Sequence, residues 1–269
     1  MPRDFTTTVL RNTHLGHDNY LLEFEAPEAA REMRPAQFFM IGIPGSATLL
    51  RRPYSVCGLP GTFADGAPDA VQLLYKVVGQ GTRLLASLKS GAAMTALGPL
   101  GNGFGDPGES AAQPVFVAGG IGSAPFPALA AALHRCASPP RMFYGARSAV
   151  DLPLLAWFRE HCADVVVTTD DGSLGRAGRV TEPLAELLER DADANLRLYA
   201  CGPEPMLKAV ARLALARGVG CELSLEAHMA CGFGVCLGCV VPTHRPGGAI
   251  GYDRLCVDGP VMTADRLAW

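Results

Sequence analysis

The chain has 269 residues, of which 49% are hydrophobic and 18% charged, with 31 glycines and 21 prolines. This length is enough for two domains and a small additional unit. The formal net charge of −3 and the lack of any lysine or arginine run argue against a nucleic-acid partner.

Segments for export or membrane insertion are not evident in the sequence. No stretch approaches the roughly 20 apolar residues of a membrane span, and the first residues lack the apolar core of a signal peptide. We therefore expect a cytoplasmic protein without membrane contact. In that reducing compartment the nine cysteines favour metal binding or redox chemistry over disulfides. Five are scattered and mostly expected in the core: Cys57, Cys136, Cys162, Cys201 and Cys221.

The first hundred residues consist of short apolar or alternating runs separated by turn signals. Runs of this length and spacing predict the strands of an antiparallel barrel or sandwich, interrupted by a short helix over 81–91. The expected strands lie within residues 5–16, 19–27, 36–45, 49–61, 70–81 and 92–101.

The pattern changes after residue 112, where apolar runs alternate with amphipathic helices. Such alternation predicts a doubly wound parallel sheet. The expected strands lie within 114–120, 141–147, 164–172 and 195–202, and the expected helices within 124–137, 152–162, 181–191 and 203–218. The segment from about 223 fits neither pattern. We therefore divide the chain into residues 1–105, 106–222 and 223–269.

Four cysteines are concentrated in that last segment. Cys231, Cys236 and Cys239 form C-x4-C-x2-C, and Cys256 follows in "YDRLCVDGP". This is the plant-type spacing of a 2Fe–2S cluster. The glycines at 232, 234 and 238 remove Cβ atoms and permit positive φ, so that backbone N–H groups can point at the anionic cluster.

Three other interpretations of the cysteines have less support. Structural zinc favours two C-x2-C pairs, whereas only one is present. Inert buried thiols would not gather four in 26 residues. A Rieske centre needs two histidines, and we expect His228 to face solvent or to lie in an outer shell.

A flavin site is indicated by "RRPYSV" and by the strand-to-helix turn "YKVVGQGT". On a strand, Arg52 and Tyr54 share one face, where a cation could meet pyrophosphate and a ring could stack on a flavin. Gly81 and Thr82 begin a helix whose free N–H groups and dipole favour phosphate. The alternatives are an ordinary edge strand and a plain capping threonine.

A nicotinamide nucleotide site is indicated by the ends of two expected parallel strands, at "VAGGIGSAP" and "YACGPEP". Ligands in open parallel sheets lie at the carboxyl ends of strands. Gly119, Gly120 and Gly122 would let a dinucleotide approach the helix start, although the full G-x-G-x-x-G fingerprint is absent. The alternative for 201–205 is a rigid strand-to-helix turn. At 170–171 we favour two aspartates that shape a turn over two that bind ribose.

Taken together, these motifs resemble the ferredoxin reductase superfamily. The resemblance is closest to the electron-transfer subunits of the two-subunit, NAD-dependent (class 1B) dihydroorotate dehydrogenases of bacteria, and it covers nearly the whole length. It includes "RRPYSV", "YKVVGQGT", "GPLGNGF", "GGIGSAP", "TDDGSLG", "CGPEPMLKAV", "EAHMACGFGVCLGCVVP" and "CVDGPV". The resemblance implies a six-stranded flavin barrel, a nucleotide-binding α/β domain and a short C-terminal cluster domain. The spacing before Cys256 is longer than the family leads us to expect.

The resemblance also assigns site residues and cofactors. It implies FAD on Arg52, Pro53, Tyr54, Ser55, Leu74, Tyr75, Lys76, Gly81 and Thr82; NAD on Gly119, Gly120, Gly122, Cys201, Gly202 and Pro203; and iron on Cys231, Cys236, Cys239 and Cys256. Ser55 and Cys201 are the candidate catalytic residues. The implied partner is an FMN-containing catalytic subunit that oxidises dihydroorotate, in a heterotetramer of two plus two chains.

Three cofactors in one chain have a physical rationale. A nicotinamide transfers two electrons together, an iron–sulfur cluster transfers one at a time, and a flavin does both. Two other functions remain open. One is a flavin and iron–sulfur subunit of another complex, such as an NADH-dependent ferredoxin:NADP oxidoreductase or a sulfhydrogenase, where an aspartate can replace the first cysteine. The other is a zinc-stabilised, non-enzymatic interaction module. NAD or NADP preference stays open, because Arg147 and Ser148 could meet a 2′-phosphate or cap a helix.

Overall fold

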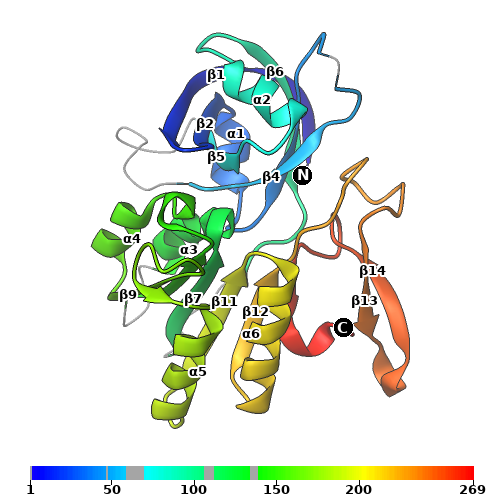
Figure 1. Ribbon diagram of the computed structural model, residues 1–269. Helices are drawn as coiled ribbons and strands as arrows, with labels where there is room; N and C mark the ends of the chain where they lie inside the picture. The colour runs from blue at the N-terminus through cyan, green and yellow to red at the C-terminus, as the bar shows by residue number, and fades with distance from the viewer. Residues whose placement is uncertain (1, 47, 59–69, 106–111, 134–138) are drawn as a thin grey trace.

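The computed structural model describes residues 2–46, 48–58, 70–105, 112–133 and 139–269. Figure 1 shows a barrel in blue and cyan, an α/β unit in green and yellow beneath it, and a C-terminal segment in orange and red beside both. Cys136 and the end of the helix expected over 124–137 lie outside the described residues.

The N-terminal unit is a six-stranded antiparallel barrel. Its strands are β1 (Arg3–Gly16), β2 (Asn19–Glu25), β3 (Phe38–Gly42), β4 (Arg52–Ser55), β5 (Ala70–Lys76) and β6 (Ala93–Leu100), in the order β4-β3-β6-β1-β2-β5. A bridge between Val56 and Leu73 and a hydrogen bond from Cys57 N to Gln72 O (2.8 Å) bring the two edges together. This confirms the barrel, and β4 and β5, the two strands of the flavin motifs, meet where it closes.

Two helices accompany the barrel. The expected one is α2 (Gln80–Ser87), and the sequence did not indicate α1 (Pro27–Glu32). The α1 helix has only six residues, too few for a helical period to be read, and it buries Ala29 and Ala30 against the barrel. Inside the barrel, alternate strand residues such as Phe24 and Phe39 meet edge to face, at 5.5 Å between ring centroids.

The second unit is built around a seven-stranded sheet. Its strands are β7 (Gln113–Gly119), β8 (Arg141–Ala146), β9 (Asp164–Thr169), β10 (Arg176–Ala177), β11 (Leu196–Cys201), β12 (Gly220–Ser224) and β15 (Val261–Thr263), in the order β10-β9-β8-β7-β11-β12-β15. All neighbouring pairs are parallel except β12 with β15. The order reverses between β7 and β11, so ligands are expected at their carboxyl ends.

Helices cover both faces of this sheet. The helices α5 (Thr181–Arg190) and α6 (Glu204–Ala216) pack on the face that includes Val115 and Leu198. The opposite face, with Phe116 and Tyr199, is covered by α3 (Phe126–Ala132) and α4 (Leu155–His161). Successive strand residues point to opposite faces, so strands apolar on both faces require helices on both, as a doubly wound fold has them.

The C-terminal segment is shared between the units. The antiparallel hairpin β13 (Val240–His244) and β14 (Ile250–Arg254) stands apart from both sheets, whereas β15 adds to the edge of the nucleotide-domain sheet. The division that we place at 222/223 therefore falls inside β12. Short 3-10 turns connect the elements: η1 (Gly120–Ser123), η3 (Ala149–Asp151), η4 (Pro246–Gly248) and η5 (Ala264–Arg266). Among the described helices, none has the length and apolarity to cross a membrane.

Candidate redox site

The four cysteines of the C-terminal segment lie close together as two pairs. Cys231 interacts with Cys236, and Cys256 with Cys239. Among the described residues, no three histidine, cysteine or acidic side chains converge on a single-ion position. Two pairs of thiols match the donor set of a two-iron cluster, in which four thiolates hold two irons.

The backbone of the loop supplies hydrogen bonds to this sulfur site. Burial alone would raise the pKa of Cys231, but hydrogen bonds from the backbone N–H groups of Cys236, Phe233 and Val235 outweigh this and lower the pKa to about 6. Burial and the neighbouring Cys239 raise the pKa of Cys256 to about 12. N–H groups directed at a thiolate stabilise its negative charge, which is the chemistry that a cluster requires of its protein.

Two of the three loop glycines adopt the conformations that we expected. Gly232 (φ +80°) and Gly234 (φ +89°) lie in the left-handed region, whereas at the third position Leu237 (φ +57°) takes that conformation instead of Gly238. The expectation for Gly238 was therefore wrong, and the strain at this turn is placed on a leucine.

The cysteine loop packs directly on the barrel. A Cβ at Gly232 would lie 2.5 Å from Cγ of Met40 and 3.5 Å from Cδ1 of Leu100, so only glycine fits there. Met40 of β3 is paired in register with Pro53 of β4, in the middle of the flavin motif. Neighbouring strands lie about 4.8 Å apart, so a single strand separates the cysteine loop from the motif expected to hold flavin.

The outer side of the loop is apolar and exposed. Cys236 is exposed, and Phe233, Val235 and Leu237 are 55%, 73% and 59% exposed, respectively. Val257, beside the fourth cysteine, is 44% exposed. An apolar cluster of this kind on a soluble surface marks a contact site for another molecule.

The flavin motifs form a cationic cradle at the start of α2. Arg52 of β4 reaches over Gly81, where a Cβ would lie 2.6 Å from Nε and 2.7 Å from Cζ of the guanidinium. Thr82 Oγ1 accepts hydrogen bonds from the N–H groups of Val78 (2.9 Å) and Gly79 (3.0 Å), and therefore shapes the turn as a capping residue does. A guanidinium over the first turn of a helix is suited to binding a pyrophosphate.

The other expected flavin residues lie around this cradle in different environments. Tyr54 is half-buried, its ring lies 5.8 Å from that of Tyr75, and burial raises its pKa to about 12, so the phenol stays protonated. Ser55 is half-buried at the end of β4. The Tyr75 side chain packs inside the barrel, and Leu74 packs between the barrel and Ala124 of the nucleotide domain. Only their backbone atoms are therefore placed to contact a ligand.

A cavity of about 680 Å³ lies at the carboxyl ends of the parallel strands, where a nucleotide was expected. Gly119, Gly120 and Pro203 line it, and the barrel contributes Lys76, which forms an ion pair with Asp151. The cavity is therefore closed on one side by the flavin barrel, as an exchange of electrons between nicotinamide and flavin would require.

Two of the glycines at this site also have a packing role that the sequence did not indicate. A Cβ at Gly119 would lie 2.6 Å from Pro203 Cδ, and one at Gly122 would lie 2.4 Å from Cys201 O. These two glycines let the 119–122 and 201–203 segments touch each other, and they lead into a 3-10 turn rather than directly into a helix. Gly120, with φ +54°, lines the cavity, and a Cβ there would meet only Asp151 O, at 3.8 Å.

Cys201, a candidate catalytic residue, is buried beneath the cavity floor. It is 2% exposed, and burial raises the pKa of its thiol well above the usual range. It is therefore a protonated packing group in this structure. Cys57 and Cys221 are also buried and Cys162 is half-buried, in agreement with the expected core packing.

Several cavity residues were not found from the sequence, or were given another role. Arg179 and Thr168 line the cavity, but neither was singled out, although they lie on either side of the "TDDGSLG" segment. Arg147, whose role was open, also lines it. Asp171 forms the expected turn, since its Oδ1 accepts hydrogen bonds from Ser173 N (2.9 Å) and Ser173 Oγ (2.6 Å), whereas Asp170 lines the cavity. The sequence could have indicated Arg179 only through its position in the turn that follows the expected strand at 164–172.

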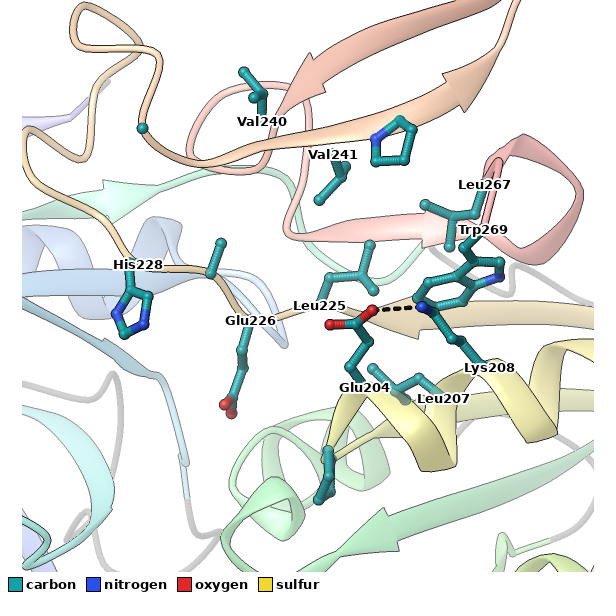
Figure 2. Close-up of a pocket in the computed structure, with 15 residues that line it drawn as sticks. Glu204, Leu207, Lys208, Leu225, Glu226, His228, Val240, Val241, Leu267 and Trp269 are labelled. Atoms are coloured by element: carbon teal, nitrogen blue, oxygen red, sulfur yellow. Dashed lines mark ion pairs between the residues drawn. The ribbon is translucent and has the colours of Figure 1, made fainter.

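A second cavity, of about 770 Å³, lies between α6 and the cysteine segment (Figure 2). Glu226 and His228 line one part of it, and Lys208 lies beside Trp269 at the other. His228 is exposed, as we expected. Pro203 lines both cavities, so the strand end at 201–203 separates the nucleotide cavity from the space beneath the hairpin.

Comparison with known proteins places these features in a family context. One family model, the iron–sulfur cluster binding domain of dihydroorotate dehydrogenase B, matches residues 226–268, and another, an oxidoreductase NAD-binding domain, matches residues 116–212. A solved structure of an NADH-dependent reduced ferredoxin-NADP oxidoreductase covers 98% of this chain and 90% of that chain, with a TM-score of 0.82 and 27% identity. A ferredoxin NADP+ reductase from Neisseria gonorrhoeae shares the fold, with a TM-score of 0.64 over 80% of this chain and 92% of that chain at 20% identity.

Curated relatives are more similar in sequence. The dihydroorotate dehydrogenase B (NAD(+)) electron transfer subunit of Caldanaerobacter subterraneus subsp. tengcongensis is 35% identical over 96% of both chains. The subunit of the same name from Geobacillus kaustophilus is 40% identical over 88% of both chains. These matches confirm the resemblance drawn from the motifs. The chain therefore belongs to the family of electron transfer subunits of NAD-dependent dihydroorotate dehydrogenase B, on a ferredoxin reductase-like fold.

Proposed function

We propose that this chain carries electrons between NAD(H) and the FMN of a dihydroorotate dehydrogenase catalytic subunit, by way of FAD and a 2Fe–2S cluster. The chain would then act in pyrimidine (UMP) biosynthesis in the cytoplasm. The observation that carries the proposal is the contact of Gly232 with Met40, which seats the cysteine loop one strand away from the flavin motif.

Each part of the chain then has a defined task. Arg52 and the first turn of α2 hold the pyrophosphate of FAD, and Tyr54 lies beside the flavin ring. The 680 Å³ cavity holds the nicotinamide nucleotide against the barrel. FAD, when bound, converts between two-electron and one-electron transfer. The four cysteines hold the cluster, and the loop N–H groups stabilise its charge.

The exposed apolar side chains of the loop support a partner at this end of the chain. Phe233, Val235 and Leu237 surround the exposed Cys236. A catalytic subunit docked there would cover the apolar surface and exchange electrons directly with the cluster. We propose a heterotetramer of two chains of each kind.

The test is a reconstitution with and without the catalytic subunit. Anaerobically purified chain should contain FAD, two irons and two sulfides, and should reduce an artificial acceptor with NADH. It should not oxidise dihydroorotate until the FMN-containing subunit is added, when NAD-dependent turnover should appear. A chain that holds no iron and sulfide, or that oxidises dihydroorotate unaided, would overturn the proposal.

The similarity to the NADH-dependent reduced ferredoxin-NADP oxidoreductase structure favours one second candidate, a subunit of another flavin and iron–sulfur complex. The higher identity to dihydroorotate dehydrogenase B subunits and the cysteine at position 231 support the first function over this one. Co-purification from the native host distinguishes the two, because it identifies the bound subunit.

A further inference from the structure

The "GPLGNGF" segment at 98–104 joins the barrel to the fourth cysteine, and the proposed function gives it no task. Gly101 follows β6 with φ +69°, and a Cβ there would lie 2.6 Å from Gly259 O and 2.6 Å from Pro260 Cδ. The backbone N–H of Asn102 donates to Gly259 O at 2.6 Å. The barrel and the segment that follows Cys256 are therefore in direct backbone contact.

The side chain of Asn102 completes this junction. Its Nδ2 donates to Val261 O at 2.9 Å and to Asp258 O at 3.2 Å, and its Oδ1 accepts from Val261 N at 2.9 Å. Both amide hydrogens and the amide oxygen are thus used on the backbone of one short segment. The side-chain amide therefore bonds both the N–H and the C=O of Val261, as the backbone of a neighbouring strand would.

The segment held by Asn102 is continuous with the turn that carries Cys256. Arg254 N donates to Asp258 Oδ2 at 2.9 Å, and Asp258 N donates to Arg254 O at 2.7 Å, which closes the turn around Cys256. Arg254 Nη1 also donates to Gly234 O at 3.2 Å, in the loop of the other three cysteines. A continuous series of hydrogen bonds therefore runs from Asn102 to both cysteine segments.

The barrel end of this junction is also fixed. Gln37 is 8% exposed, and its Nε2 donates to Gly101 O at 2.8 Å while its Oε1 accepts from Arg34 N at 2.7 Å. Phe104 N donates to Pro35 O at 2.9 Å. The residues before and after Asn102 are thus bonded to the barrel, so Asn102 fixes the cysteine segments at a defined position relative to the barrel.

We infer that Asn102 is a positioning residue that fixes the Cys256 segment on the flavin barrel and thereby sets the placement of the cluster relative to the flavin. This inference rests on the proposed function, because it takes the four cysteines as cluster ligands and the barrel as the FAD site. Electron transfer between two centres slows steeply with their separation, so a junction that fixes the separation also controls the rate.

The test is Asn102→Asp, which keeps the shape and the acceptor for Val261 N but places a carboxylate oxygen against two carbonyls. The matched control is Asn12→Asp in the same barrel. Asn12 Nδ2 likewise donates to two carbonyls, Leu85 O (2.9 Å) and Leu88 O (3.3 Å), and its Oδ1 accepts from Tyr75 Oη (3.1 Å). Asn12 belongs to the barrel junction with α2, so its replacement reports general destabilisation without affecting the Cys256 segment.

Hydrogen exchange is the first measurement. Amides of residues 256–259, 261 and 262 should exchange about tenfold faster or more in Asn102→Asp, since two partly buried hydrogen bonds become repulsive contacts. They should keep the wild-type rate in Asn12→Asp. Gly101→Ala, which disturbs the same junction by collision with Gly259 O, should reproduce the Asn102→Asp pattern. Unchanged exchange at 256–262 in both junction variants would overturn the inference, whether or not the chain holds iron.

The second measurement uses the loaded chain. In Asn102→Asp, the electron paramagnetic resonance signal of the reduced cluster should change in shape, and cluster reduction by NADH should slow at least several-fold while flavin reduction keeps its rate. A wild-type chain without iron would refute the proposed function but not the junction, which the exchange rates decide. A wild-type chain with a cluster whose signal and reduction rate are unchanged in Asn102→Asp would refute the positioning role alone.

Discussion

Replacing Gly81 with alanine should separate flavin affinity from protein stability. The new methyl group would lie 2.6 Å from Arg52 Nε, so the guanidinium must leave its place over the first turn of α2. The end of an arginine side chain moves at little cost, and the φ of Gly81 is not in the left-handed region. Because alanine gains up to about 1 kcal/mol over glycine in a helix, the FAD-free protein should unfold at an equal or higher temperature.

The same substitution should weaken FAD binding. Loss of a charge-assisted hydrogen bond costs about 1.5–3 kcal/mol, which corresponds to about 10- to 150-fold in affinity. Titration of the FAD-free protein, followed by quenching of flavin fluorescence, measures this directly. In an Arg52→Ala background, Gly81→Ala should add little, because the group that it displaces is already gone. An affinity for FAD within about twofold of wild type in Gly81→Ala would refute this account of the cradle.

Three further predictions concern the cysteines and the C-terminal hairpin. Cys236→Ser should abolish the spectroscopic signal of the cluster, while FAD content and NADH oxidation with a dye as acceptor stay as in the wild type. The control Cys162→Ser should leave all three unchanged. Retention of two irons in Cys236→Ser would contradict the proposed set of iron ligands. In the metal-free folded chain at pH 8, alkylation followed by mass spectrometry should find the exposed Cys236 and the half-buried Cys231, whose pKa is lowered to about 6, modified first. The buried Cys57 and Cys201 should stay unmodified until denaturant is added, because burial raises the pKa of both. Burial would raise the pKa of the Asp253 carboxyl, but its interactions with Arg245 and Arg266 outweigh this and lower the pKa. The ionised Asp253 therefore stabilises the folded chain fully above about pH 4. This stabilisation is lost as the pH falls through the lowered pKa. Asp253→Asn should cost about 1–3 kcal/mol at pH 7 in thermal unfolding and should remove that acid dependence; an unchanged pH profile would count against the ion pairs.

The sequence alone was sufficient for the features that depend on local pattern. Period-two runs and turn signals located all six barrel strands, and strands apolar on both faces required helices on both sides of the second sheet. The cysteine spacing defined the cluster loop because iron ligation fixes the distances between thiolates, whatever the surrounding fold. Such features are encoded within about ten neighbouring residues.

Only the tertiary structure decided where these pieces meet. No local pattern could show that Gly119 and Gly122 are glycines because 201–203 presses against them, or that Arg179 lines the nucleotide cavity. The same holds for Gly232 on Met40 and for Asn102 on Val261, residues separated by more than 150 positions in the chain. Contacts at this separation depend on how two domains pack, so the placement of the cysteine loop beside the flavin motif is a property of the assembled fold.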